Sequence, residues 1–121
     1  MNKKLIQKII IEYGGFFGGA ERRTLTHDGE DIYVEREFYN GLPDDGRVLY
    51  QNKKWSELLT ELKELHIDDW DQEYNDPDVM DGTQWSLDIE FSDDSEGIHI
   101  WGSNMFPNNF GDFLKVIEMR R

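Results

Sequence analysis

The side chains of this sequence that could carry chemistry are concentrated in residues 68–81, where carboxylates alternate with aromatic rings. Carboxylate oxygens are the ligands that calcium prefers, so an EF-hand loop is the first possibility. The spacing excludes it, because neither Asp76 nor Asp81, the sixth residues of the two registers, is the glycine that the loop requires. A calcium site of another type stays open, although loop carboxylates are more often simply solvated. The residues of interest are Asp68, Asp69, Trp70, Asp71, Glu73, Tyr74, Asp76, Asp78 and Asp81.

Two further carboxylates, Asp88 and Glu90, could act as a hydrolytic pair if they faced a cleft. They share one face of a predicted strand, opposite its apolar residues, which predicts that both point into solvent. The three histidines show no metal-binding spacing, and the lack of cysteine excludes thiolate ligands and a cysteine nucleophile. We therefore expect a protein that is not an enzyme and uses no cofactor or metal. A metal-dependent or carboxylate-based hydrolase is the alternative, and a structural or assembly module is a third hypothesis.

Charge is distributed very unevenly along the chain. The net charge is -13 at pH 7, and Lys63 and Lys115 enclose a stretch that holds fourteen Asp and Glu residues but no lysine or arginine. Like charges at this density repel each other in a compact state, so they favour a partner of opposite charge or a role in solubility. We expect the nine residues named above to bind a basic protein partner, rather than nucleic acid or a membrane.

The two aromatic residues of this segment, Trp70 and Tyr74, have two interpretations. Aromatic rings supply contact area in interfaces, while the surrounding charges speed the approach of the partner. The same rings could instead fold back onto the core, which would leave the carboxylates in a solubilising role. The sequence leaves both interpretations open.

The apolar pattern predicts the elements that must position this segment. Amphipathic helices are predicted at residues 53–65, with Asn52 as the expected N-cap, and from Asn108 or Asn109 through Ile117. Asp28 and Gly29 predict a hairpin turn. Strands are predicted at residues 9–13, 22–26, 31–39, 85–91 and 98–100, with a further short one at 48–50.

This order, β-β-β-(β)-α-β-β-α, indicates one α+β domain over residues 1–121. Its expected architecture is a single antiparallel sheet of about five strands with two helices packed on one face. Residues 66–82 then form a long connection, and ordered connections of this length are often functional. No apolar run reaches the roughly 18 residues that span a bilayer, so a cytoplasmic protein is expected.

The stretch from Asp81 to Phe91, followed by the stretch from Gly102 to Phe110, resembles a segment of small uncharacterised bacterial proteins. The resemblance covers about a third of the chain and includes Gly82-Thr83-Gln84-Trp85 and Gly102-Ser103-Asn104. In size and acidity the chain also resembles the immunity proteins of bacterial toxin systems. That resemblance implies a cytoplasmic protein that binds and blocks one cognate toxin, and it brings no catalytic residue with it.

Overall fold

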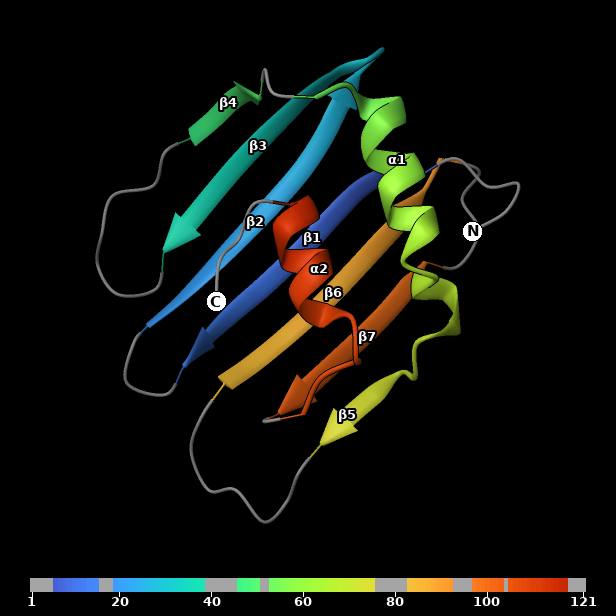
Figure 1. Cartoon of the computed structure of the whole chain (residues 1–121). Helices are drawn as coiled ribbons and strands as arrows, with labels where there is room; N and C mark the ends of the chain where they lie inside the picture. The colour runs from blue at the N-terminus through green and yellow to red at the C-terminus, as the bar shows by residue number, and fades with distance from the viewer. Residues whose placement is uncertain are drawn as a thin grey trace.

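The chain folds into a seven-stranded sheet with two helices, as a computed structural model shows (Figure 1). The structure describes residues 6–15, 19–38, 46–50, 53–75, 83–92, 97–103 and 105–117. The helices are α1 (Trp55–Glu64) and α2 (Phe110–Val116), and a short 3₁₀ turn, η1 (Ile67–Asp69), follows α1. The strands are β1 (Ile6–Gly15), β2 (Gly19–Asp28), β3 (Asp31–Phe38), β4 (Gly46–Tyr50), β5 (Glu73–Asn75), β6 (Thr83–Phe91) and β7 (Ile98–Ser103).

The strands lie in the order β4-β3-β2-β1-β6-β7-β5. All neighbours are antiparallel except β5 and β7, which pair in parallel. The predicted α+β class is therefore confirmed. The predicted sheet was purely antiparallel with about five strands, and it differs in detail from the observed mixed sheet of seven strands. The difference arises mainly at β5, because this three-residue strand lies inside residues 66–82, where the sequence predicts only a connection.

The glycine positions explain how β1, β2 and β3 are joined. Gly29 adopts a positive φ of 60° in the two-residue turn between β2 and β3, as the Asp-Gly pattern predicts. At the other end of β2, Gly15 pairs with Gly19 across the sheet. The paired glycines therefore end one strand and begin the next, as the sequence indicates.

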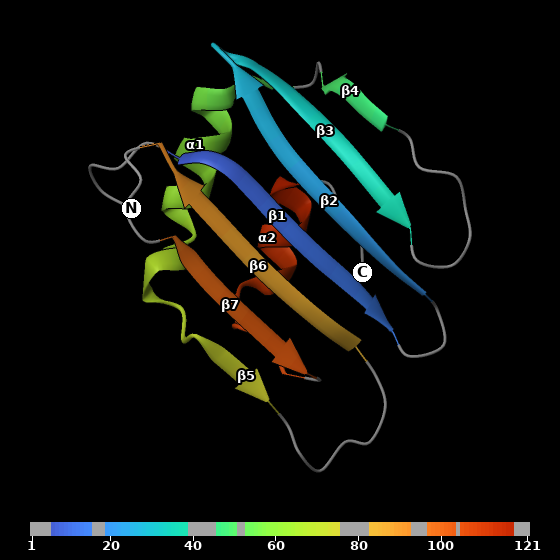
Figure 2. The ribbon, with the colours of Figure 1, turned by 180° about the vertical axis from the view of Figure 1, so that it is seen from behind.

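The core lies between the helices and one face of the sheet. The central strands β1 and β6 contribute Ile9, Ile11, Leu87 and Ile89, all with 0% exposure. Because side chains alternate across a strand, the residues between them point to the opposite face. Viewed from behind, the two helices lie entirely on one side of the sheet (Figure 2). The helices bury Trp55, Leu58 and Leu62 from α1, and Phe110, Phe113 and Leu114 from α2.

Local interactions set the ends of α1. The helix begins at Trp55 with Lys54 at the N-cap, whose backbone N–H donates to the Glu57 carboxylate at 3.4 Å. The predicted cap, Asn52, lies outside the described residues. His66 stops the helix with a φ of 54°, the left-handed conformation that glycine usually supplies at this position.

Candidate protein-binding surface

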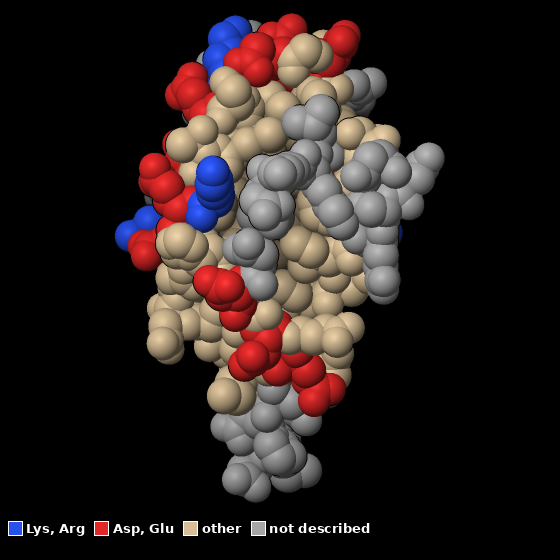
Figure 3. Space-filling view, turned by 90° about the vertical axis from the view of Figure 1, so that its right-hand side faces the viewer, with Lys and Arg blue, Asp and Glu red and all other residues tan. Residues whose placement is uncertain are grey.

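The acidic segment runs along the β5 edge of the sheet. Asp69, Asp71 and Glu73 are exposed there, and we call these three residues the edge acids. Acidic side chains gather over this part of the molecule in the view from the right-hand side of Figure 1 (Figure 3). Among the other predicted residues, the side chain of Asp68 and all of Asp76, Asp78 and Asp81 lie outside the described part of the chain.

Trp70 turns inward from this edge and packs on the core. Its ring meets Phe113 at 5.6 Å and Trp85 at 6.3 Å between centroids, in both cases edge to face. Its indole N–H donates to Asn109 Oδ1 at 3.0 Å, and Asn109 Nδ2 donates to the carbonyl of Leu65 at 2.8 Å. Asn109 therefore bridges Trp70 to the C-terminal end of α1, instead of capping α2 with its side chain.

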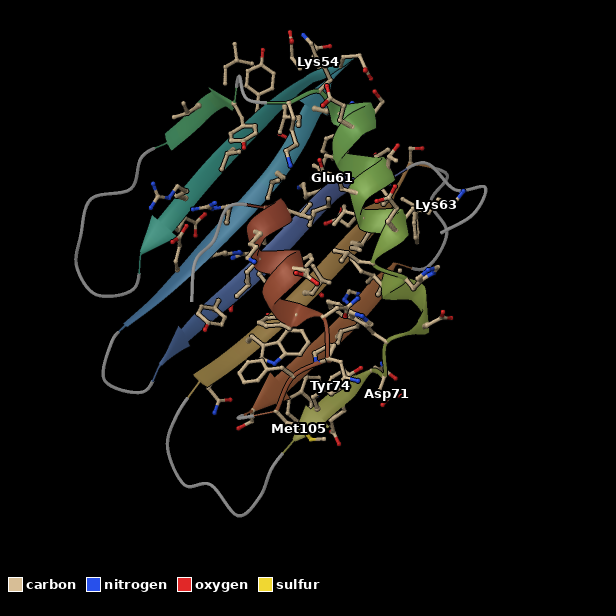
Figure 4. All side chains as sticks on the ribbon, in the orientation of Figure 1. Lys54, Glu61, Lys63, Asp71, Tyr74 and Met105 are labelled. Atoms are coloured by element: carbon tan, nitrogen blue, oxygen red, sulfur yellow. The ribbon has the colours of Figure 1, made fainter. Side chains whose placement is uncertain are left out.

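Tyr74 also packs inward, with its ring centroid 5.9 Å from that of Trp85. Its hydroxyl accepts a hydrogen bond of 2.9 Å from the backbone N–H of Asp71, and the two residues lie together at the lower edge in Figure 4. Of the two interpretations that the sequence leaves open, packing on the core therefore describes both rings. Their anchoring fixes the backbone that carries the edge acids.

The ion pairs of the described residues leave the edge acids without a cation. Arg23 and Arg36 both bind Glu21, at 2.9 and 3.1 Å. The remaining lysine and arginine pairs also use acids from the first half of the chain, and in the second half Asp88 pairs with His99. Within the described residues, Asp69, Asp71 and Glu73 take part in none of these pairs. The negative charge of this edge is therefore not neutralised by described basic side chains of the chain itself.

The edge acids adjoin a second surface, the sheet face opposite the helices, which we call the open face. In the described part of the chain, no helix or strand covers it (Figure 2). Among the lysines and arginines whose side chains are described, strand alternation places Lys8 and Arg22 on this face, and Arg22 lies 3.6 Å from Glu12. The same alternation places eight carboxylates there, from Glu12, Asp28, Asp31, Glu35, Glu37, Glu73, Asp88 and Glu90.

Trp101 lies on the open face between β6 and β5. In the strand register it sits opposite Ser86 on one side and Glu73 on the other, and it is 43% exposed. The serine side chain is small, so one side of the indole is left accessible. Sequence reasoning did not select this residue, although its alternation with Ile98 and Ile100 was a signal that it faces outward.

The open face also has a shallow hollow of about 420 Å³ over β1, β2 and β3. Its lining combines Lys8 and Arg22 with Glu35 and Glu37, so its charges are mixed. Asp88 and Glu90 lie on the open face beside His99, as their predicted strand position requires. No group of three or more His, Asp or Glu side chains that could hold a metal ion occurs among the described residues.

Comparisons with protein-family models, curated proteins and solved structures find no match to this chain. Within the described residues, neither helix combines the length and apolar character needed to cross a bilayer.

Proposed function

We propose that this protein is an acidic, non-enzymatic binding protein that docks a basic protein partner on its open face and the adjoining edge acids. The observation that supports the proposal is that the open face and the edge acids meet at Glu73. This residue is one of the unpaired edge acids, and its register partner is the exposed Trp101. A large exposed aromatic ring beside a carboxylate, on a face that carries further carboxylates, provides both contact area and long-range attraction for a cationic surface.

The size of the sheet face suits this role. A stable protein interface buries about 800 Å² on each partner, and a face of several strands offers an area of this order. The described side chains of the face include eight carboxylates and two bases, Lys8 and Arg22, so their balance is negative. At physiological salt such charges act over about 8 Å, so they mainly raise the association rate.

The most specific form of the proposal is an inhibitor or immunity protein of the cytoplasm that neutralises a basic toxin or a nucleic-acid-acting enzyme. Such an enzyme must carry a cationic surface to hold its polyanionic substrate. A rigid acidic face that covers this surface blocks the enzyme without any chemistry of its own. The acidity of the chain and the resemblance to immunity proteins support this form.

The test is the association rate with a partner captured from the native cell and then purified. We compare the wild type with a triple variant, Asp69→Asn, Asp71→Asn and Glu73→Gln. The control removes the same charge from exposed positions away from the open face and the edge acids, with Glu30→Gln, Glu57→Gln and Asp112→Asn. At low salt, stopped-flow measurements should show association slowed by about three- to tenfold for the edge triple and less than about twofold for the control.

Equal slowing by both triples would show a general charge effect and refute docking at this edge. Unchanged rates for both would refute the electrostatic argument altogether. A second variant, Trp101→Ala, should weaken the complex by about 30-fold through faster dissociation, because exposed tryptophans at interface centres are common hot spots. Its control is Val48→Ala, which removes an apolar side chain that is 51% exposed on the helix side of the sheet.

A further inference from the structure

Trp101 of β7 is a large aromatic residue that the core does not use. Among the aromatic side chains that the structure describes, it alone is exposed. Its neighbours in the strand face the helices, since Ile100 is buried and Gly102 lies against the indole of Trp85. The Trp101 ring therefore lies on the open face, where β7 and β5 run side by side at one end of the sheet (Figure 2).

The exposed Glu73 on β5 lies beside this ring on the same face. The two strands pair in parallel with Glu73 opposite Trp101, and the backbone N–H of Trp101 donates to the carbonyl of Gln72 at 3.1 Å. The packing of Tyr74 on Trp85 holds β5 in this position. Because neighbouring strands are about 4.8 Å apart, one bound group can contact both the indole and the carboxylate.

Two hydrogen-bonded pairs account for the polar side chains on the other sides of the ring. They are Asp88 with His99, and Gln84 Nε2 with Ser103 Oγ at 2.8 Å. The residue directly opposite Trp101 on β6 is Ser86, whose side chain is small. The accessible side of the indole is therefore bordered by these pairs and by the carboxylate of Glu73.

The sequence supplies no cation from this part of the chain. The interval between Lys63 and Lys115 contains no lysine or arginine, and it includes residues 76–82, 93–96 and 104, which adjoin β5, β6 and β7. Lys63 and Lys115 themselves belong to the helices, on the other side of the sheet. Glu73 takes part in none of the ion pairs between described residues. A cation that contacts both the indole and the carboxylate is therefore expected from another molecule.

We propose that Trp101 and Glu73 form a receptor site for one arginine side chain of the basic partner. The guanidinium plane stacks on the indole, and its N–H groups donate in parallel to the two oxygens of the Glu73 carboxylate. Arginine suits the site better than lysine, because its planar and weakly hydrated cation makes both contacts at once, whereas an ammonium group is strongly hydrated. This inference rests on the proposed function and names the partner residue that the open face recognises.

The test uses two peptide probes of equal charge, tetraarginine amide and tetralysine amide. At low salt, titration calorimetry should show that the wild-type protein binds tetraarginine about threefold to fivefold more tightly, which is the ratio expected from stacking of one arginine at an exposed site. Trp101→Leu should reduce this ratio to less than about 1.5-fold. In NMR spectra, the indole N–H signal that Trp101→Leu removes should shift on binding of tetraarginine, while the signal of the buried Trp55 should not.

A matched pair of charge variants locates the site. Glu73→Gln should weaken tetraarginine binding by about threefold to fivefold, against less than about twofold for Glu35→Gln, which removes the same charge from an exposed position of β3 on the same face. Equal losses in these two variants would overturn the proposal, as would an unchanged ratio in Trp101→Leu.

The two peptides also separate this inference from the proposed function. Equal affinity of the wild type for tetraarginine and tetralysine, with binding that strengthens as the salt concentration falls, would overturn the arginine site but agree with charge-driven docking. The absence of binding by either peptide at low salt would refute both.

Discussion

Gly102 is a position where one added carbon atom should damage the fold. A Cβ built on this residue lies 2.5 Å from Cε2 of Trp85, closer still to its Nε1, and 2.8 Å from the carbonyl oxygen of Met105. Ordinary carbon contacts are about 3.5–4.0 Å, so the indole or the backbone has to move by about 1 Å. Gly102→Ala is therefore predicted to destabilise the protein.

The packing around Trp85 determines how large this loss of stability should be. Its side chain is 3% exposed, and the ring centroids of Phe110, Tyr74 and Phe106 lie 4.6, 5.9 and 6.3 Å away. Overpacking in such a site typically costs about 1–3 kcal/mol. The indole N–H also donates to the Met105 carbonyl at 2.9 Å, and losing this bond adds about 1 kcal/mol. The free energy of unfolding should fall by about 2–4 kcal/mol.

Urea unfolding, followed by tryptophan fluorescence and by circular dichroism, measures this change. The melting temperature should fall on the order of 10 °C for a chain of this size. The matched control is Gly111→Ala in α2, where a Cβ meets nothing within 4 Å and alanine favours the helix by about 0.5–1 kcal/mol. A loss of less than about 0.5 kcal/mol for Gly102→Ala would refute the packing argument.

Two further substitutions test single contacts. Asn109→Ala removes the hydrogen bonds to Trp70 Nε1 and to the Leu65 carbonyl, so the free energy of unfolding in urea should fall by about 2 kcal/mol. The control is Asn108→Ala at the exposed neighbouring residue, which should lower it by less than about 0.5 kcal/mol. His66→Gly should raise the unfolding free energy by about 0.5–1 kcal/mol, because glycine adopts the φ of 54° without a Cβ penalty; a lower melting temperature would contradict this reason.

Much of this architecture follows from apolar spacing in the sequence. The strand at Trp85–Phe91 is buried on alternate residues, and the two helices bury the stripes that their spacing predicts. These predictions succeed because a helix or strand that buries one face must repeat its apolar residues with its own structural period. Arg36, which interrupts the apolar face of β3, lies at the uncovered end of that face and pairs there with Glu21.

β5 could not be predicted in this way. It contains only three residues, it lies among acids, and its pairing with β7 depends on residues about 28 positions later in the chain. Local periodicity carries no information about such a pairing. The inward packing of Trp70 has the same origin, because its partners are Phe113 of α2 and Asn109, the N-cap of that helix.

The open face depends on strand order, which the sequence does not specify. Alternation predicts that Glu12, Asp88 and Glu90 point away from the core. It does not predict that β1 and β6 are neighbours, which gathers these acids on one surface. A cavity of about 310 Å³ on the helix side of the sheet likewise exists because the two short helices lie toward the β6 side and leave part of β3 and β4 uncovered (Figure 1).

The central position of β1 has a consequence for biosynthesis. Gly15 pairs with Gly19 on one side and with Thr83 on the other, so one partner of β1 follows at once and the other is translated much later. Until β6 leaves the ribosome, the far edge of β1 exposes unpaired backbone groups beside Ile9, Ile10 and Ile11. Unpaired apolar edges of this kind template aggregation. Nascent or truncated chains that end before Thr83 should therefore depend on chaperones to stay soluble.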